Sequence, residues 1–188
     1  MKYRESGMPN EEIWEEFFNP QQILQSLEVT NDIKKFIDIG CGYGTFLIPA
    51  SKIISGVAIG VDIDKDYLTL CKQRGEDNNI ANIHLFNGDI SNFDNNTMSM
   101  FQDADYITMF NILHCEEPLK LIGQSIKLLK KGGKIGVIHW IYEDTPRGPS
   151  LDIRPKPEDI IKWGKYSGLK LIKQVQLPPY HFGILFEK

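Results

Sequence analysis

The sequence predicts an α/β fold, built on one mostly parallel sheet with helices on both faces. Short, nearly continuous apolar runs of strand length alternate with stretches of helical periodicity from about residue 35 to residue 167, as in a sheet that is buried on both sides. Two further apolar runs, 169–177 and 183–187, are joined by only five residues. Strands joined so closely must pair antiparallel, because a parallel pair needs a long crossover.

Two helical patterns occupy residues 1–30, ahead of the first strand. In the first pattern, Trp14 and Phe17 lie on one helical face, with acidic residues in the first turn, where the helix dipole favours negative charge. Pro20 interrupts this pattern, and a second apolar run covers residues 23–27. Two roles remain open for Trp14 and Phe17: they pack on the core, or they cover a binding site.

The first predicted strand ends in a glycine turn. A run of apolar residues carries one acid, Asp38, and breaks into Gly40, Gly42 and Gly44. Glycine admits positive φ and lets a ligand come close to the backbone, and the helix that follows presents unpaired N–H groups. A dinucleotide turn has the spacing G-x-G-x-x-G and holds a pyrophosphate, which Asp38 would repel. The carboxylate suits a cationic ligand end, such as an amino-acid ammonium.

The other elements follow in alternation. Strands are predicted at 35–39, 57–62, 83–86, 106–111 and 135–140, and helices at 46–54, 64–78, 118–131 and 158–167, with either a helix or a loop at 94–102. Between the last strand and helix of this series, residues 143–157 contain four prolines and two arginines. In a compact domain, a segment of this length without helix or strand usually has a function beyond connecting two elements.

Polar residues stand at the ends of the middle strands. Ligands of open parallel sheets bind beyond the carboxyl ends of the strands, near the point where the strand order reverses. Asp62 ends the second strand, 22 residues after Gly40, which is close to the roughly 20 expected of an acid that binds a ribose. Asp64 is the rival, and its position favours capping of the next helix. Asp89 and Asn111 follow the next two strands.

The sequence D-I-G-C-G-Y-G of residues 38–44 resembles motif I of the class I S-adenosylmethionine (SAM) methyltransferases. The resemblance implies a seven-stranded sheet in the order 3-2-1-4-5-7-6, with strand 7 antiparallel. It also implies a single domain, in which residues 1–30 form lid helices and residues 31–188 the Rossmann-like core. The implied cofactor is SAM and its product S-adenosylhomocysteine. The cofactor-binding residues that the resemblance implies are Asp38, Gly40, Cys41, Gly42, Gly44, Asp62 (ribose), Ile63, Asp89 and Ile90 (adenine), and Asn111.

The segment after the fourth strand, F-N-I-L-H at residues 110–114, points to one branch of that family. It lacks the two prolines and the aromatic residue that follow an acid or Asn in methyltransferases of DNA bases and glutamine. Cytosine-C5 enzymes use a thiolate beside a proline, and Cys41, Cys71 and Cys115 have no such neighbour. Cys41 is therefore interpreted as a spacing residue, and the chain resembles the small-molecule branch.

His114 is the first catalytic candidate, because it follows the fourth strand and faces the expected cleft. An imidazole has an unperturbed pKa of about 6.5, so His114 could act as a base or orient the acceptor. The alternative is that it caps the next helix. The turn 178–182 should overhang the same sheet edge, which makes His181 a second catalytic candidate and Tyr180 a substrate contact.

Two further segments are predicted to complete the acceptor pocket. Arg147 and Arg154, in the 143–157 segment, would clamp an anionic acceptor or would be solvated loop arginines, and Arg147 is taken as a substrate contact. Trp14 and Phe17 would contribute apolar surface from the N-terminal helix. The aromatic residues suggest an acceptor with an apolar body and a polar or anionic handle.

Composition limits the partners. The 188 residues carry a net charge of −4, which gives no electrostatic reason to expect nucleic acid. No signal peptide or membrane-spanning run is visible. Three widely spaced cysteines form neither a disulfide framework nor a zinc pattern. We therefore expect no metal site, no membrane partner and a cytoplasmic protein; the oligomeric state is not predicted.

The sequence thus predicts an enzyme that transfers a methyl group from SAM to a small molecule of unknown identity. A nucleic-acid or protein methyltransferase is the alternative within the same fold. A SAM-binding protein without catalysis is a third possibility. A nicotinamide-dependent oxidoreductase is disfavoured by Asp38 and by the spacing of the glycines.

Overall fold

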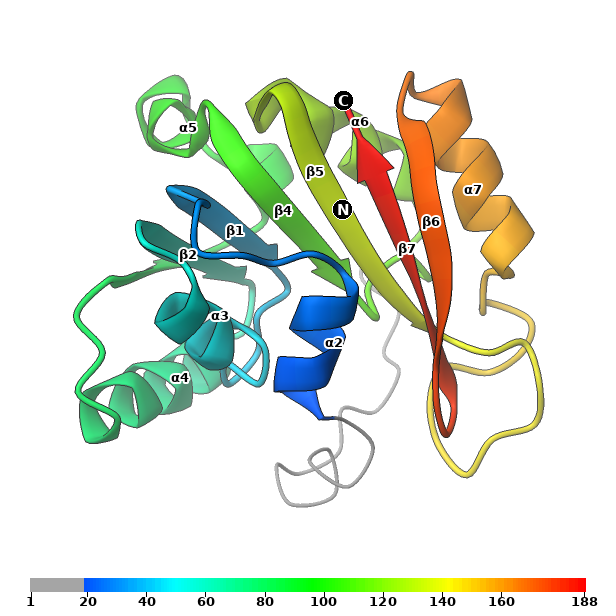
Figure 1. The fold of residues 1–188 in the computed structure, drawn as a ribbon, viewed down its shortest axis with the longest axis horizontal. Coiled ribbons are helices and arrows are strands. Elements are labelled where there is room, and N and C mark those ends of the chain that lie inside the picture. Colours follow the sequence, from blue (N-terminus) through cyan, green and yellow to red (C-terminus); the bar gives the residue numbers. More distant parts are fainter. Residues whose placement is uncertain (1–18) are drawn as a thin grey trace.

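One seven-stranded sheet runs through the molecule in the order β3-β2-β1-β4-β5-β7-β6 (Figure 1). The computed structural model describes residues 19–188. The strands are β1 (Lys35–Ile39), β2 (Val57–Asp62), β3 (Ile83–Asn87), β4 (Ala104–Phe110), β5 (Leu129–Trp140), β6 (Lys170–Leu177) and β7 (His181–Glu187). The first five strands pair in parallel, and β7 is antiparallel to both β5 and β6. The predicted strand order and the antiparallel β7 are confirmed.

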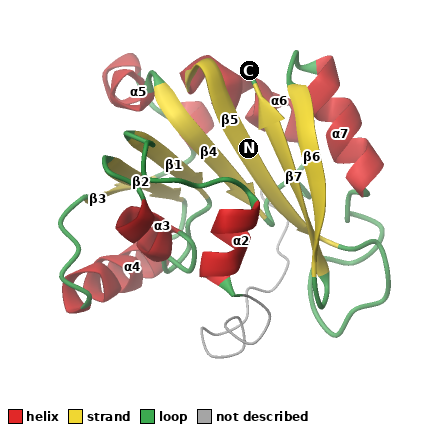
Figure 2. Cartoon of the chain, in the orientation of Figure 1, coloured by secondary structure: helices red, strands yellow, loops and turns green. Residues whose placement is uncertain are grey.

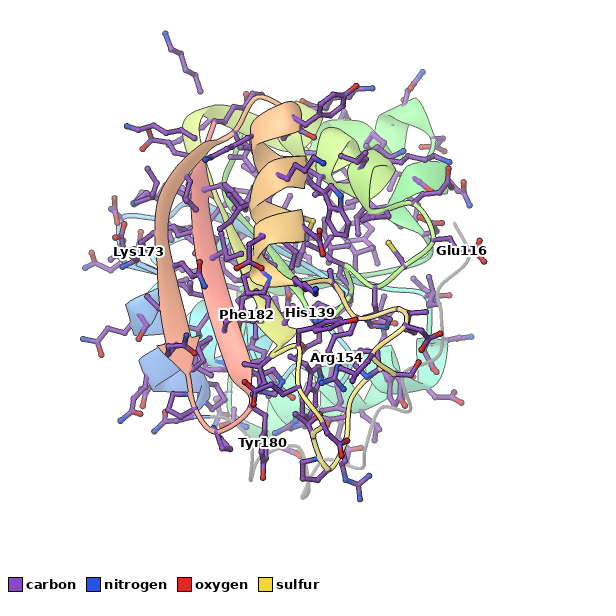
Figure 3. The ribbon with its side chains drawn as sticks, turned by 90° about the vertical axis from the view of Figure 1, so that its right-hand side faces the viewer. Glu116, His139, Arg154, Lys173, Tyr180 and Phe182 are labelled. Atoms are coloured by element: carbon purple, nitrogen blue, oxygen red, sulfur yellow. The ribbon has the colours of Figure 1, made fainter. Side chains whose placement is uncertain are left out.

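Helices cover both faces of the sheet. They are α2 (Pro20–Ser26), α3 (Leu47–Ile53), α4 (Lys65–Asp77), the short 3-10 helix η1 (Ile90–Asn92), α5 (Asn95–Phe101), α6 (Pro118–Leu128) and α7 (Pro157–Tyr166). One core contains residues of α2, α3 and α4, and the other contains residues of α5, α6 and α7. Figure 3 shows α7 and α2 on opposite sides of β6 and β7.

The strands read as continuous apolar runs because both of their faces are buried. In β1, Phe36 belongs to the core under α2 and α3, whereas Ile37 belongs to the core under α5 to α7. Both side chains are fully buried, as expected when successive residues of a strand point to opposite faces. No helix within residues 19–188 is long and apolar enough to cross a membrane.

The segment that follows α2 is fixed to the middle of the sheet. Tyr106 Oη, on β4, donates a hydrogen bond of 2.5 Å to the carbonyl of Leu27. The carboxylate of Glu28 accepts from Lys134 Nζ at 2.7 Å and from Lys173 Nζ at 2.9 Å. The second of the two predicted N-terminal helices therefore packs on the core. The first, with Trp14 and Phe17, lies outside the described residues.

β5 begins earlier than the sequence suggested. The helix predicted to extend to residue 131 ends at Leu128, and β5 follows it without a loop. The reason is backbone pairing at the end of the chain: the N–H of Gly132 donates to the carbonyl of Lys188 at 2.9 Å, and the N–H of Lys188 donates to the carbonyl of Gly133 at 2.9 Å. Pairing between residues so far apart in the sequence cannot be read from the local periodicity of apolar residues.

The hydrogen bond of Tyr106 can be used to test whether the segment after α2 is fixed to the sheet. Tyr106→Phe should lower the free energy of unfolding by about 1–2 kcal/mol, because the carbonyl of Leu27 loses its donor inside the core. Urea unfolding of both variants measures this. Tyr166→Phe is the matched control, since Tyr166 is 83% exposed, and it should change the free energy by less than about 0.5 kcal/mol. Equal effects would contradict the assignment.

Candidate cofactor and acceptor site

The carboxyl ends of the parallel strands meet at one edge of the sheet, where the connecting loops gather (Figure 2). The strand order reverses next to β1, whose neighbours are β2 and β4. In α/β sheets this is where ligands bind. The glycine turn follows β1 at this point, so the predicted cofactor residues come together at the expected place.

Three positive backbone angles explain the three glycines of the turn. The φ angles of Gly40, Gly42 and Gly44 are 77°, 52° and 88°, in the left-handed region that side chains disfavour. A Cβ atom on Gly40 would also lie 2.7 Å from Cγ2 of Ile112. The turn is joined to β2 because the N–H groups of Gly40 and of the next residue both donate to the carbonyl of Val61, at 2.8 and 3.2 Å.

Asp62 connects the end of β2 to the glycine turn. Its carboxylate accepts from the N–H of Gly42 at 2.7 Å and from the N–H of Asp64 at 2.9 Å. Burial raises the pKa of Asp62, and these two backbone hydrogen bonds oppose the increase. Each carboxylate oxygen can accept a further hydrogen bond, so the geometry remains compatible with a ribose. The neighbouring Ile63 is 50% exposed, an apolar surface next to the expected nucleoside.

Asp64 caps α4 rather than facing a ligand. Its Oδ1 accepts from the N–H of Asp66 at 2.8 Å and from the N–H of Tyr67 at 3.3 Å. This is the arrangement of a helix N-cap, in which a side chain satisfies donors of the first turn. The predicted capping role of Asp64 is confirmed.

Asp38 is a buried carboxylate at the floor of the turn. It is 2% exposed and accepts a hydrogen bond of 2.7 Å from Thr108 Oγ1 on β4. Burial raises the pKa of Asp38 to about 7, the bond from Thr108 opposes this, and the charge of Asp62 adds to it. A cationic group nearby would restore the ionised form. Asp38 therefore fits the ammonium end of SAM.

Asn111 is strained and its amide is unsatisfied. Its φ angle is 56°, although it is not a glycine. The amide nitrogen and oxygen are buried, and neither has a hydrogen-bond partner within residues 19–188. A buried amide without partners costs free energy unless something supplies them. Asn111 follows β4 directly, beside the turn that follows β1, so a bound cofactor or acceptor would supply these bonds.

Thr45 is a candidate that the sequence reasoning missed. Its hydroxyl is buried and has no partner in the described part of the chain, and the residue is 8% exposed. It lies between the last glycine of the turn and the start of α3. Its position in the sequence could have indicated this role. A hydroxyl between a glycine turn and the helix that follows lies where anionic or polar ligands bind.

Asp89 and Ile90 follow β3 at the same edge. Asp89 Oδ1 accepts from the N–H of Ser91 at 2.8 Å and from Ser91 Oγ at 2.7 Å, so it caps η1. Ile90 is 1% exposed and belongs to the core. The adenine contacts predicted for these two residues remain predictions.

Cys41 lies under the turn, where it is 5% exposed. A hydrogen bond with Cys71, together with burial, raises the pKa of the Cys41 thiol well above its ordinary value. A thiol held in the protonated form is a poor nucleophile, which supports the interpretation of Cys41 as a spacing residue. Within residues 19–188, no group of three or more His, Cys, Asp or Glu side chains could hold a metal ion.

His114 is buried close to a second histidine. It is 6% exposed, and its Nδ1 lies 3.4 Å from Nε2 of His139 on β5. The N-cap of α6 is Glu117, so the alternative in which His114 caps that helix is wrong. His139 was not predicted, because a histidine inside a strand-length apolar run gives no local sign of what it will face.

His181 does not lie on an overhanging turn. It is the first residue of β7, pairs with Trp140 and Leu177, and is 1% exposed. Its ring packs against Trp140 with 4.1 Å between the ring centroids. Burial, with a contribution from Arg154, lowers the pKa of His181 to about 3. The ring is therefore neutral near pH 7 and is a poor general base, although a neutral contact with an acceptor stays a prediction.

The two arginines of the 143–157 segment have different environments. Arg154 is 6% exposed and donates to the carbonyls of Pro149 and Ile141, with the closest distances 2.6 and 2.9 Å. It also lies over the ring of Trp140, at 5.8 Å. The alternative of a solvated arginine is therefore wrong for Arg154, which organises its own segment. Arg147 is exposed, and its predicted role as a substrate clamp remains a prediction.

A cavity of about 420 Å³ lies beside this region, at the ends of β6 and β7. Tyr180, at the hairpin tip, is half-buried and stacks on Trp140 with 6.3 Å between the ring centroids. Figure 3 shows Arg154 and Phe182 on the side of this hairpin where α7 lies. The lining residues are Ile141, Tyr142, Glu143, Pro157, Glu158, Gln174, Gln176, Pro178, Pro179, His181 and Phe182.

The profile of the methyltransferase domain family matches residues 30–147, which include the glycine turn and the first five strands. The chain belongs to this family. The predicted class I methyltransferase fold is thereby confirmed, and SAM is the methyl donor of the family. The residues at the sheet edge fit this cofactor, because the buried carboxylate of Asp38 and the unsatisfied amide of Asn111 need polar partners there.

Similar proteins differ in their acceptors. A demethylmenaquinone methyltransferase of a Geobacillus species is 27% identical over 54% of this chain and 43% of its own length. A ribosomal protein L11 methyltransferase of Neisseria meningitidis is 33% identical over 71% of this chain and 43% of its own length. The chain thus spans less than half the length of these curated relatives.

Solved structures show the same fold. A SAM-dependent methyltransferase from Aquifex aeolicus has a TM-score of 0.79 at 20% identity, covering 92% of this chain and 90% of that chain. A magnesium protoporphyrin IX methyltransferase from Synechocystis, solved with bound SAM, has a TM-score of 0.66 at 16% identity, covering 90% and 76%. At these identities the likeness supports the fold and not the acceptor.

The contrast between Asp62 and Asp64 yields a test of the cofactor site. Asp62→Ala should weaken SAM binding by about 2–3 kcal/mol, since it removes charge-assisted hydrogen bonds both to the ligand and to the turn. Isothermal titration calorimetry measures this. Asp64→Ala is the matched control and should cost about 1 kcal/mol of unfolding free energy through the lost N-cap, with little change in affinity. Similar losses of affinity would mean that the wrong acid is assigned to the ribose.

Proposed function

We propose that this chain transfers the methyl group of SAM to a small molecule that bears a cationic or hydrogen-bond-donating group. The observation that carries the proposal is the cavity of about 420 Å³ at the sheet edge, which is within the range of small-molecule sites. Its polar lining within residues 19–188 is made of Tyr142, Glu143, Glu158, Gln174, Gln176 and His181, with no Lys or Arg among them. This chemistry favours a donor or a cation over the anionic handle suggested by the sequence.

The position of the cavity suits an acceptor site. It lies at the ends of β6 and β7, and β5 separates these strands from β4 and Asn111. Neighbouring strands are about 4.8 Å apart, so β7 and β4 are roughly 10 Å apart, a distance that a small-molecule acceptor can span. Among the lining residues, Ile141, Phe182 and the two prolines of the hairpin turn would form an apolar wall.

The residues of this chain have few chemical tasks. The sulfonium of SAM supplies an already activated methyl group. The glycine turn, Asp62 and Asp38 would hold the cofactor, and the amide of Asn111 would orient the groups between cofactor and acceptor. His114 would take up a proton from an acceptor that is a weak nucleophile. The apolar wall of the cavity would exclude water from the transfer.

A protein acceptor is the second candidate. It is favoured by the ribosomal protein L11 methyltransferases among the relatives, of which one is 33% identical over 71% of this chain. A side chain with a cationic end would also satisfy the carboxylates of the cavity. The acceptor's size therefore has to be determined by experiment.

Methyl transfer from labelled SAM to a fractionated cell extract tests the proposal. The purified chain should label compounds in the low-molecular-weight fraction, and Asp62→Ala should strongly reduce this label when SAM is limiting. Label confined to the protein fraction would favour the second candidate instead. Absence of label in both fractions, with SAM binding intact, would contradict the proposed transfer.

A pair of variants on β6 tests the role of the cavity once a labelled compound is found. Gln176→Trp should fill the cavity and raise the KM for the acceptor about tenfold, equivalent to about 1.4 kcal/mol. Lys170→Trp is the matched control, because Lys170 is exposed at the other end of the same strand. An unchanged KM in Gln176→Trp would remove the cavity from the acceptor site.

A further inference from the structure

Two histidines from different elements form a buried pair near the end of β4. Nδ1 of His114 and Nε2 of His139 are 3.4 Å apart, and the rings are nearly perpendicular, with an interplanar angle of 77°. His139 is fully buried on β5, one residue before the strand ends at Trp140, and its ring centroid is 6.4 Å from that of Phe182. Figure 3 shows His139 and Phe182 side by side near the foot of α7.

Stability of the fold does not account for an imidazole at this position. Nδ1 of His139 is buried and has no hydrogen-bond partner within residues 19–188. An unsatisfied polar atom in a core costs free energy, whereas an apolar ring of similar shape would not carry this cost. Besides a backbone interaction with the adjacent Trp140, the ring of His139 makes its polar contact with His114. The role of His139 should therefore be found in what it does to His114.

His139 is a neutral partner. Burial lowers its pKa well below the usual value, an interaction with the backbone of Trp140 opposes the decrease, and the charges of His114, His181 and Arg154 lower the pKa further. These are the titratable and charged groups that act on it from the β4–α6 connection, from β7 and from the 143–157 segment. A neutral imidazole has one N–H and one lone pair, so the hydrogen atom between the two rings has two possible arrangements.

We propose that His139 is a positioning residue, whose Nε2 accepts the Nδ1–H of His114 and so leaves the lone pair of His114 on Nε2. The proposal rests on the role of His114 in the proposed function. In the opposite arrangement His139 donates from Nε2, and neutral His114 then carries its hydrogen on Nε2, where it could not accept a proton. Only the proposed arrangement fits a base that acts through Nε2.

The proton balance follows directly. As the bond between acceptor and methyl group forms and the sulfur–methyl bond breaks, the proton of the acceptor goes to Nε2 of His114. The resulting imidazolium has two N–H groups, of which the one at Nδ1 still donates to His139 Nε2. This bond becomes charge-assisted and therefore stronger. His139 neither gains nor loses a proton, and His114 later returns its proton to solvent.

Long-range 1H–15N spectra of histidine-labelled protein test the proposal without any acceptor. At about pH 8.5, where an ordinary imidazole is neutral, His114 should carry its hydrogen on Nδ1 and have a lone pair on Nε2. His139→Phe removes the acceptor atom and should abolish this preference, whereas His139→Gln can accept through its amide oxygen and should retain it. Equal affinity of the three proteins for S-adenosylhomocysteine shows that the cofactor site is unchanged.

Two results would overturn the positioning role. One is a neutral His114 with its hydrogen on Nε2, and the other is the same tautomer preference in His139→Phe. Kinetics with a labelled acceptor adds a functional readout: His139→Phe should lower kcat about tenfold or more at unchanged KM, and His139→Gln should restore most of it. If the tautomers are as proposed but no transfer occurs with any acceptor, the proposed function fails and the positioning of His114 stands.

Discussion

The site depends on the carboxylate of Asp62, which holds the glycine turn against the end of β2. Three glycines with positive φ, at every second residue of the turn, give a backbone with little stiffness of its own. Asp62 constrains it by accepting the N–H of Gly42 at 2.7 Å, while the carbonyl of Val61 accepts from the start of the turn. The same carboxylate is the predicted ribose ligand. The residue that would bind the cofactor is thus also the residue that shapes the turn.

Unsatisfied and strained groups gather at the edge of the sheet where this turn lies. Asn111 combines a φ of 56° with an unpartnered amide, and the hydroxyl of Thr45 has no partner within residues 19–188. Asp38 is a nearly fully buried carboxylate. Native proteins leave few buried polar groups unpaired, and strain is concentrated at functional sites. Their common location supports a ligand site more strongly than any single residue does.

Local sequence patterns predicted the backbone geometry around the glycine turn. The spacing of glycines and acids is a local property, so the positive φ angles of the turn and the capping role of Asp64 could be foreseen, and the resemblance to a known family implied the order of the strands. The start of β5 could not, because it depends on pairing with Lys188.

The acceptor side was harder to predict for the same reason. Arg154 turned out to be buried against its own backbone segment, and His181 to be a neutral residue of β7 rather than part of a turn. The contact between His114 and His139 joins residues 25 positions apart on neighbouring elements. Burial and charge at these positions are set by tertiary packing, which hydrophobic periodicity does not describe.

Calorimetric titration with SAM at a series of pH values tests the central claim, that the turn and its buried acids form a SAM site. SAM should bind and NAD should not. The pKa of Asp38 is about 7 in the free protein and should fall when an ammonium group binds beside it. Below about pH 7, binding must therefore release a proton, and affinity should decrease by up to tenfold per pH unit, a dependence that Asp38→Asn should remove. Binding of NAD without SAM would contradict the account.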